Sequence, residues 1–229
     1  MDSKNCTLRV LTTSRLAAQA CAVSGFCDLE QAAAPLPESR NLSRRRECGN
    51  SQHFLFHKSG ELIAMPQQDI TEQDLFFLRR AIELALEARN DGRHPFGALI
   101  VNERGETIVA ARNNAVRPKG DPTQHAELVA CSEAARLLPE AELAKCTLYT
   151  STEPCAMCAG AIYWTGVGRV VFALAETGLL NYTGNDKQNP TLDLPCREVF
   201  ARGQKRIAVA GPLLEEEAGK VHEGFWLPC

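Results

Sequence analysis

The chain has 229 residues, of which 45% are hydrophobic and 23% charged, a composition typical of a globular protein with one sizeable domain and a tail, or two small domains. No apolar run reaches the roughly 18 residues of a membrane helix, so we expect no membrane association. Residues 1–67 hold eight Lys and Arg against six Asp and Glu, whereas residues 68–229 hold seventeen against twenty-two. The larger, acidic part therefore has no general field for phosphate, which argues against a large nucleic-acid partner.

Residues 1–67 show no sustained hydrophobic period, and the stretch AAAPLPESRNLSRRRECGNS is typical of a linker or disordered tail. Lys4, Arg9 and Arg15 face only Asp2 in the first 26 residues, which leaves an organelle transit peptide as one interpretation and a plain extension as the other. We interpret residues 1–67 as this tail and residues 68–229 as one domain.

The ten cysteines are too scattered for a small disulfide-stapled scaffold, and no signal peptide with a clean apolar region is visible. We therefore expect a reducing compartment, the cytoplasm. In such a compartment Cys131, Cys146 and Cys196 should behave as small buried hydrophobic residues.

The pattern sharpens at Thr71, which can cap a helix together with Asp74. Apolar residues then recur at helical spacing, and Gly92 closes the segment: Leu75, Leu78, Ile82 and Ala85. The later elements, in chain order, are expected to be strands 97–102 and 107–113 joined by the turn ERGE, a helix from about His125, strand 147–151, helix 154–166, strand 169–174, a loop over 175–195, helix 197–203, strand 206–211 and helix 213–226.

Strands that alternate with helices predict an α/β fold, with a central sheet covered on both faces. The first two strands should be antiparallel, because a four-residue turn cannot make a crossover. The later strands are joined through helices and can therefore run parallel.

Two short motifs carry the chemistry. The stretch DPTQHAE contains His125 and Glu127, and STEPCAMC contains Cys155 and Cys158. One imidazole and two thiolates suit a catalytic Zn²⁺ ion that keeps an open position for water. Both motifs fall at expected helix starts, whose partial positive charge helps to hold two thiolates. Glu127 would remain free to move protons between water, substrate and leaving amine.

Cys155 and Cys158 could instead form a redox pair, or half of a structural zinc site. The structural site needs a fourth ligand, for which His94, Cys131 and Cys146 are the candidates, although none of them forms a second close pair.

The motifs HAE and PCAMC resemble those of the cytidine deaminase superfamily, whose zinc enzymes share a His-x-Glu and a later Pro-Cys-x-x-Cys. The order of PFGALIV, DPTQHAE and LYTSTEPCAMCAGAIYW is similar to the branch with guanine deaminases and bacterial tRNA adenosine deaminases. The resemblance implies a three-layer α/β/α sandwich with a mixed five-stranded sheet, and a homodimer.

By position in these motifs, the resemblance implies zinc at His125, Cys155 and Cys158, and Glu127 as the catalytic residue. It also implies four substrate-binding residues: Asn114, the amide N–H of Ala126, Phe96 and Trp164. The acidic patch that guanine deaminases carry after the fourth strand is missing, because the chain there reads LLNYTGNDKQNP. The basic tail of the tRNA enzymes is missing as well, because the chain ends FWLPC.

We therefore expect a zinc-dependent hydrolytic deaminase of a nucleobase or nucleoside, with a small purine such as guanine as the substrate. The alternative is a tRNA-specific adenosine deaminase. A more distant one is a non-catalytic partner subunit with the same fold, which the presence of Glu127 argues against.

Overall fold

The computed structural model describes residues 69–116, 120–184, 186–187 and 189–226, together with the backbone of two short strands, β1 (Phe54–Phe56) and β2 (Leu62–Ala64). These strands pair antiparallel, so the stretch expected to be an irregular tail contains a short hairpin. The rest of that stretch, residues 1–53, 57–61 and 65–67, lies outside the described residues, as does residue 68. Residues 53–229 form one compact unit, which includes the whole of the expected domain.

Helix α1 (Glu72–Asn90) begins where the sequence predicts, at a capping box. The Thr71 hydroxyl accepts a hydrogen bond from the Asp74 amide at 3.1 Å, and the Asp74 carboxylate accepts one from the Thr71 amide at 2.9 Å. The helix buries one face against the strand that follows it. Gly97 makes this contact close, because a Cβ atom there would lie 2.5 Å from the Ala81 carbonyl oxygen.

The central sheet has five strands in the order β4-β3-β5-β6-β7. They are β3 (Gly97–Val101), β4 (Thr107–Arg112), β5 (Thr147–Thr152), β6 (Arg169–Leu174) and β7 (Ala208–Ala210). Strand β3 runs antiparallel to both β4 and β5, while β6 runs parallel to both β5 and β7. The antiparallel first pair, the parallel later pairs and the mixed five-stranded sheet are thus confirmed.

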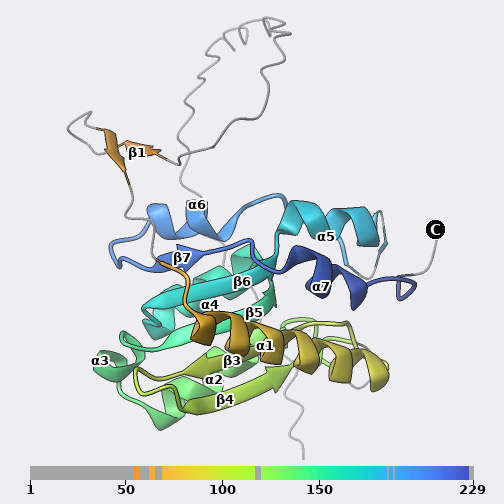
Figure 1. The fold of residues 1–229 in the computed structure, drawn as a ribbon, viewed down its shortest axis with the longest axis horizontal. Helices are drawn as coiled ribbons and strands as arrows, with labels where there is room; N and C mark the ends of the chain where they lie inside the picture. Colours follow the sequence, from red (N-terminus) through yellow and green to blue (C-terminus); the bar gives the residue numbers. More distant parts are fainter. Residues whose placement is uncertain are drawn as a thin grey trace, which may run out of the picture. The chain divides into compact units, whose positions relative to one another are not determined.

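Helices cover both faces of this sheet (Figure 1). Helix α1 packs against β3 and β5, and α7 (Glu215–Lys220) packs against β6. On the other face, α2 (Ala126–Leu137) packs against β4 and β3, with α4 (Ala156–Thr165) beside it. The expected three-layer α/β/α sandwich is therefore the observed fold.

The expected loop over 175–195 is wrong in its first half, because α5 (Glu176–Thr183) forms there. Leu179 and Thr183, one helical turn apart, are both buried, so packing stabilises a helix that the Gly- and Asn-rich composition does not suggest. A short helix, α3 (Glu140–Leu143), was not expected either. Helix α6 (Cys196–Ala201) forms close to the expected helix 197–203.

The closing helix is shorter than the expected 213–226. Helix α7 ends at Lys220, and the chain continues through turns in which Gly224 takes a φ of +64°. His222 and Trp226 still pack inward, with 1% and 9% of their surfaces exposed. None of the helices in the described part is long and apolar enough to cross a bilayer.

Cys131, Cys146 and Cys196 are buried among apolar side chains, which confirms their expected place in the core. Burial raises the pKa of the Cys131 thiol to about 12, so this group stays protonated and unreactive near neutral pH.

A buried polar network lies at the amino ends of β5 and β6. Tyr149 donates a hydrogen bond to Asp74 at 2.8 Å, and Arg169 donates two to the same carboxylate. Burial by itself would raise the pKa of Asp74, but the Arg169, Thr71 and Tyr149 hydrogen bonds outweigh it and hold the pKa well below its usual range.

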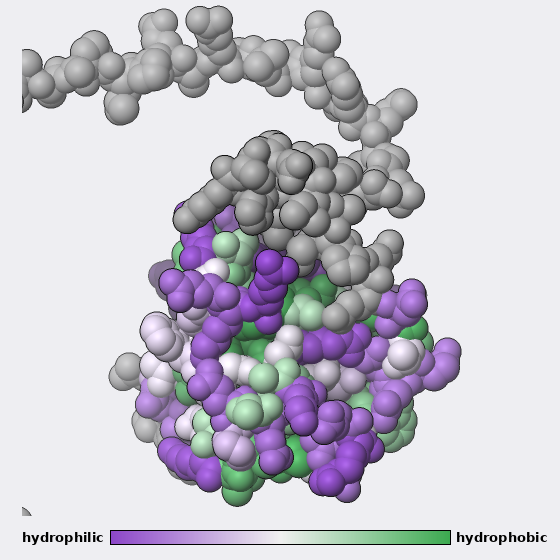
Figure 2. Space-filling view, turned by 90° about the vertical axis from the view of Figure 1, so that its left-hand side faces the viewer, coloured by the Kyte–Doolittle hydropathy of each residue, from purple (hydrophilic) through white to green (hydrophobic). Residues whose placement is uncertain are grey.

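Figure 2 views the molecule from the α3 side of Figure 1 and shows a mostly hydrophilic surface with small apolar patches.

Candidate metal centre and active site

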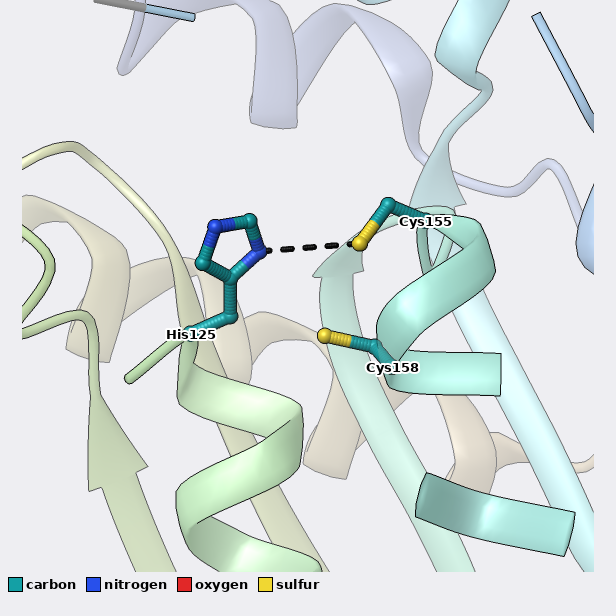
Figure 3. A group of neighbouring side chains, drawn as sticks. All are labelled: His125, Cys155 and Cys158. Carbon is teal, nitrogen blue, oxygen red and sulfur yellow. Dashed lines mark hydrogen bonds between the residues drawn. The ribbon is translucent and has the colours of Figure 1, made fainter. Parts of the chain in front are cut away.

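His125, Cys155 and Cys158 come together where two helices begin. His125 is the N-cap of α2, Cys155 is the N-cap of α4, and Cys158 lies in the first turn of α4. Figure 3 shows the imidazole and the two thiols pointing toward one another from these two helices. One ligand atom from each residue lies within 4.8 Å of the other two. The structure thus brings together the three residues that the sequence predicts as metal ligands.

The spacing of these atoms suits a zinc ion. A tetrahedral Zn²⁺ with Zn–N and Zn–S bonds of about 2.05 and 2.3 Å places its nitrogen and sulfur ligands about 3.6 Å apart. The distance from His125 Nδ1 to Cys155 Sγ is 3.6 Å. Within the described residues, His94, Cys131 and Cys146 are not part of this group, so the structure offers none of the fourth ligands proposed for a structural zinc site.

The electrostatics of the group favour a thiolate at Cys155. Its hydrogen bond with Cys158 is the largest influence on its pKa, and with the hydrogen bond to His125 it outweighs burial and lowers the pKa to about 4. The hydrogen bond with Cys155 in turn raises the pKa of His125. An anionic sulfur beside an imidazole is the donor set that Zn²⁺ prefers.

Glu127 lies beside the metal group without being part of it. Only 4% of its surface is exposed, and its two oxygens have different partners. Thr150 donates a hydrogen bond to Oε1 at 3.2 Å, and the Cys158 thiol donates one to Oε2 at 3.6 Å. Burial raises the pKa of the Glu127 carboxyl, which suits a group that must both accept and release a proton near neutral pH.

A cavity of about 610 Å³ opens onto this group, a volume suited to a small-molecule ligand. Its wall includes His125 and Cys155 at the metal end, Glu127 beside them, and the aromatic rings of His94 and Phe96. Phe96 is thus placed where a substrate-packing surface would be. Behind it, His222 and Trp226 pack against its ring, at centroid distances of 5.3 and 6.2 Å.

The other predicted substrate residues lie differently. Trp164 does not line the cavity, because it sits near the end of α4 remote from Cys155 and leaves 78% of its surface exposed. Asn114 is not in the wall either, and its amide donates to Gln124 Oε1, which ties the ends of the intervening loop together. Ala126 is the first residue of α2, with a fully buried side chain, and the role of its amide stays a prediction.

The sequence reasoning missed two carboxyl groups in the wall of the cavity and one buried amide that contacts a wall residue. Asn113 is fully buried, and its Nδ2 has no hydrogen-bond partner among the described residues, whereas its Oδ1 accepts from the Ala115 amide at 2.8 Å. Glu153 and Glu176 both line the cavity. The doublet Asn113-Asn114 was a signal for the first of these groups, and the motif STEPCAMC, in which Glu153 stands two residues before Cys155, was a signal for the second, but no local signal places Glu176.

Glu153 and Glu176 are held in different ways. Both oxygens of Glu153 accept backbone hydrogen bonds, from Glu176 at 3.3 Å and from Cys196 at 3.1 Å. Burial, together with the charges of Cys155, Glu153 and Glu127, raises the pKa of the Glu176 carboxyl to about 7. The wall of the cavity near the metal group is therefore rich in carboxyl groups.

Comparison with known proteins agrees with this site. Residues 71–174 match the family model of the cytidine and deoxycytidylate deaminase zinc-binding region. A probable cytosine deaminase of Schizosaccharomyces pombe is 43% identical over 164 residues, or 71% of this chain and 98% of the relative. The guanine deaminase of Bacillus subtilis is 47% identical over 102 residues, or 44% of this chain and 64% of that protein.

Among solved structures, the guanine deaminase from Nitrosomonas europaea is similar with a TM-score of 0.55 and 26% identity, over 70% of this chain and 87% of that one. The chain belongs to the cytidine deaminase superfamily. Within it, the chain is a hydrolytic deaminase.

Proposed function

We propose that this deaminase holds one zinc ion at His125, Cys155 and Cys158 and acts on a free nucleobase, with guanine or a closely related purine as the substrate. The observation that carries the proposal is the meeting of three ligand atoms within 4.8 Å beside a buried carboxyl group, at the wall of a cavity with room for a nucleobase.

Zinc bound there would supply an activated water molecule at neutral pH. The reaction breaks the exocyclic C–N bond of the base and forms a C–O bond, so protons must move to the ring nitrogen and to the departing ammonia. Glu127 carries these protons. Thr150 fixes one oxygen of its carboxyl group, and burial raises the pKa of that group, which favours its protonated form.

The charge of the cavity wall supports a small neutral substrate. The described residues of the wall include three carboxyl groups, Glu127, Glu153 and Glu176, and one lysine, Lys187. Such a wall repels phosphate groups, so it favours a free base over a nucleotide or a tRNA anticodon loop. The similarity to guanine deaminases supports a purine, whereas the S. pombe relative makes cytosine the competing base.

The test is an ammonia-release screen of the zinc-loaded chain on guanine, guanosine, adenine, adenosine, cytosine and cytidine, with a tRNA anticodon stem-loop assayed for inosine. We expect ammonia release from guanine and no inosine in the stem-loop. Activity on the stem-loop alone would establish the tRNA alternative, and activity confined to cytosine would replace the purine.

Glu127→Gln separates the enzyme from a non-catalytic partner subunit. The variant should keep its zinc, measured by atomic absorption, and lose about 100- to 10,000-fold in kcat, because the amide cannot carry a proton. Unchanged turnover would refute the role of Glu127. The homodimer and the cytoplasmic location stay predictions, and light scattering on the purified chain tests the first.

A further inference from the structure

The carboxylate of Glu176 lies on the cavity wall and takes no part in the proton transfers proposed above. Glu176 is the first residue of α5, and Ala175 alone separates it from the end of β6. Its side chain is half-buried, and it shares the cavity with Glu127 and with the metal-binding residues His125 and Cys155.

The backbone at Glu176 is firmly held. Its amide donates to Glu153 Oε2 at 3.3 Å, and the amide of Glu153 donates in turn to Leu174 at 2.8 Å. Leu179, almost one turn further along α5, is buried with 3% of its surface exposed. The position from which the carboxylate enters the cavity is therefore set by both the sheet and the core.

The carboxylate itself has no such partners. Within the part of the chain that the structure describes, neither oxygen of Glu176 accepts a hydrogen bond, whereas both oxygens of Glu153 do. When a substrate displaces water from the cavity, a carboxylate without a donor loses its hydration without compensation. A substrate with an N–H group at this point avoids that cost, and one without it is rejected.

We propose that Glu176 is a specificity-determining residue that accepts a hydrogen bond from a ring N–H next to the amino-bearing carbon of the substrate. This inference rests on the proposed function and narrows its substrate class. In guanine the amino-bearing C2 lies between N3, which must gain a proton, and N1–H, which can donate one hydrogen bond. In cytosine and adenine the corresponding carbon lies between one unprotonated nitrogen and one carbon.

Two carboxyl groups at the metal end of one cavity match the guanine arrangement. Glu127 serves the unprotonated nitrogen on one side of the reacting carbon, and Glu176 accepts from the N–H on the other side. Glu176 moves no proton in this scheme, and its effect is on which base binds and reacts.

The experiment compares guanine with 2-aminopurine, which carries the same amino group at C2 but an unprotonated N1. In the wild type, kcat/KM and binding should both favour guanine. At about pH 8.5, where the Glu176 carboxyl with its pKa of about 7 is ionised, Glu176→Leu removes the acceptor and should lower kcat/KM for guanine roughly 10- to 100-fold, the range for a hydrogen bond to a charged group, while 2-aminopurine changes little. Glu176→Gln presents a donor as well as an acceptor and should shift the ratio further toward 2-aminopurine.

The matched control is Glu198→Gln, the same change at an exposed position of α6 outside the cavity wall. It should leave the ratio of the two substrates unchanged, and zinc content should be equal in all variants. If both Glu176 variants keep the wild-type ratio within about twofold, the proposal for Glu176 is wrong even though the enzyme deaminates guanine.

A wild type that prefers 2-aminopurine or cytosine to guanine overturns the inference without need of any variant, so the outcome does not depend on whether the variants fold. A wild type that releases ammonia from no base at all would instead contradict the proposed function.

Discussion

The buried imidazole of His222 should make the stability of the protein depend on pH. Only 1% of its surface is exposed, and its Nδ1 accepts a hydrogen bond from Trp226 Nε1 at 3.3 Å. Burial, followed by the charge of Arg89, lowers its pKa from 6.5 to about 4. The folded state therefore holds a neutral ring in a range where the unfolded chain binds a proton.

Because the pKa is lowered on folding, the unfolded state binds more protons between about pH 6.5 and 4, and stability is lost as the pH falls through that window. One pKa unit corresponds to about 1.4 kcal/mol, so the full effect is about 3 kcal/mol. Between pH 7.5 and 5 the loss should be about 2 kcal/mol.

His222→Asn keeps an acceptor for the Trp226 indole and cannot titrate. Urea unfolding of wild type and variant at a series of pH values gives the difference in unfolding free energy, from which contributions of other groups, including the metal site, cancel. We expect the wild type to be the more stable at pH 7.5 and its advantage to shrink by about 2 kcal/mol at pH 5. A difference that stays constant over this range would refute the reasoning.

Three further changes test the fold and the metal site. Gly97→Ala should destabilise the protein by about 1–3 kcal/mol in thermal unfolding because the new methyl meets the backbone of α1, whereas Gly160→Ala, with open space around it on α4, should be neutral or stabilising. Asp74→Asn should cost about 3 kcal/mol at neutral pH because it removes the carboxylate from a mostly buried ion pair with Arg169. Because the pKa of Asp74 is lowered on folding, the wild type should lose this contribution as the pH falls below about 4. Cys158→Ala should purify with far less than one zinc per chain by metal analysis, and a wild-type zinc content would show that its thiol is no ligand.

The grouping of His125, Cys155 and Cys158 at the candidate metal site could be predicted because its signals are local. His125 and Glu127 lie two residues apart at one helix start, and Cys155 and Cys158 lie within one helical turn at another. Only the meeting of the two helices depends on the fold.

The rest of the site depends on tertiary structure. The side-chain amide of Asn114 donates to Gln124, whereas that of Asn113 has no partner among the described residues. This difference depends on the conformation of the loop between Asn114 and Gln124. The direction of Trp164 depends on how α4 is rotated against the sheet, and its sequence neighbourhood does not record this. Glu176 reaches the cavity from the start of α5, outside both motifs, so no spacing rule within them could have included it.

Glu153 joins the segment that carries the candidate metal ligands Cys155 and Cys158 to the part of the cavity wall that begins at α5. It lies between β5 and Cys155, and its carboxylate receives the first backbone amides of both α5 and α6. Because both contacts are made to main-chain atoms, the side chains of the connecting loop can change during evolution while the loop stays anchored at both ends. A single carboxylate thus couples both ends of this loop to the segment that carries Cys155 and Cys158.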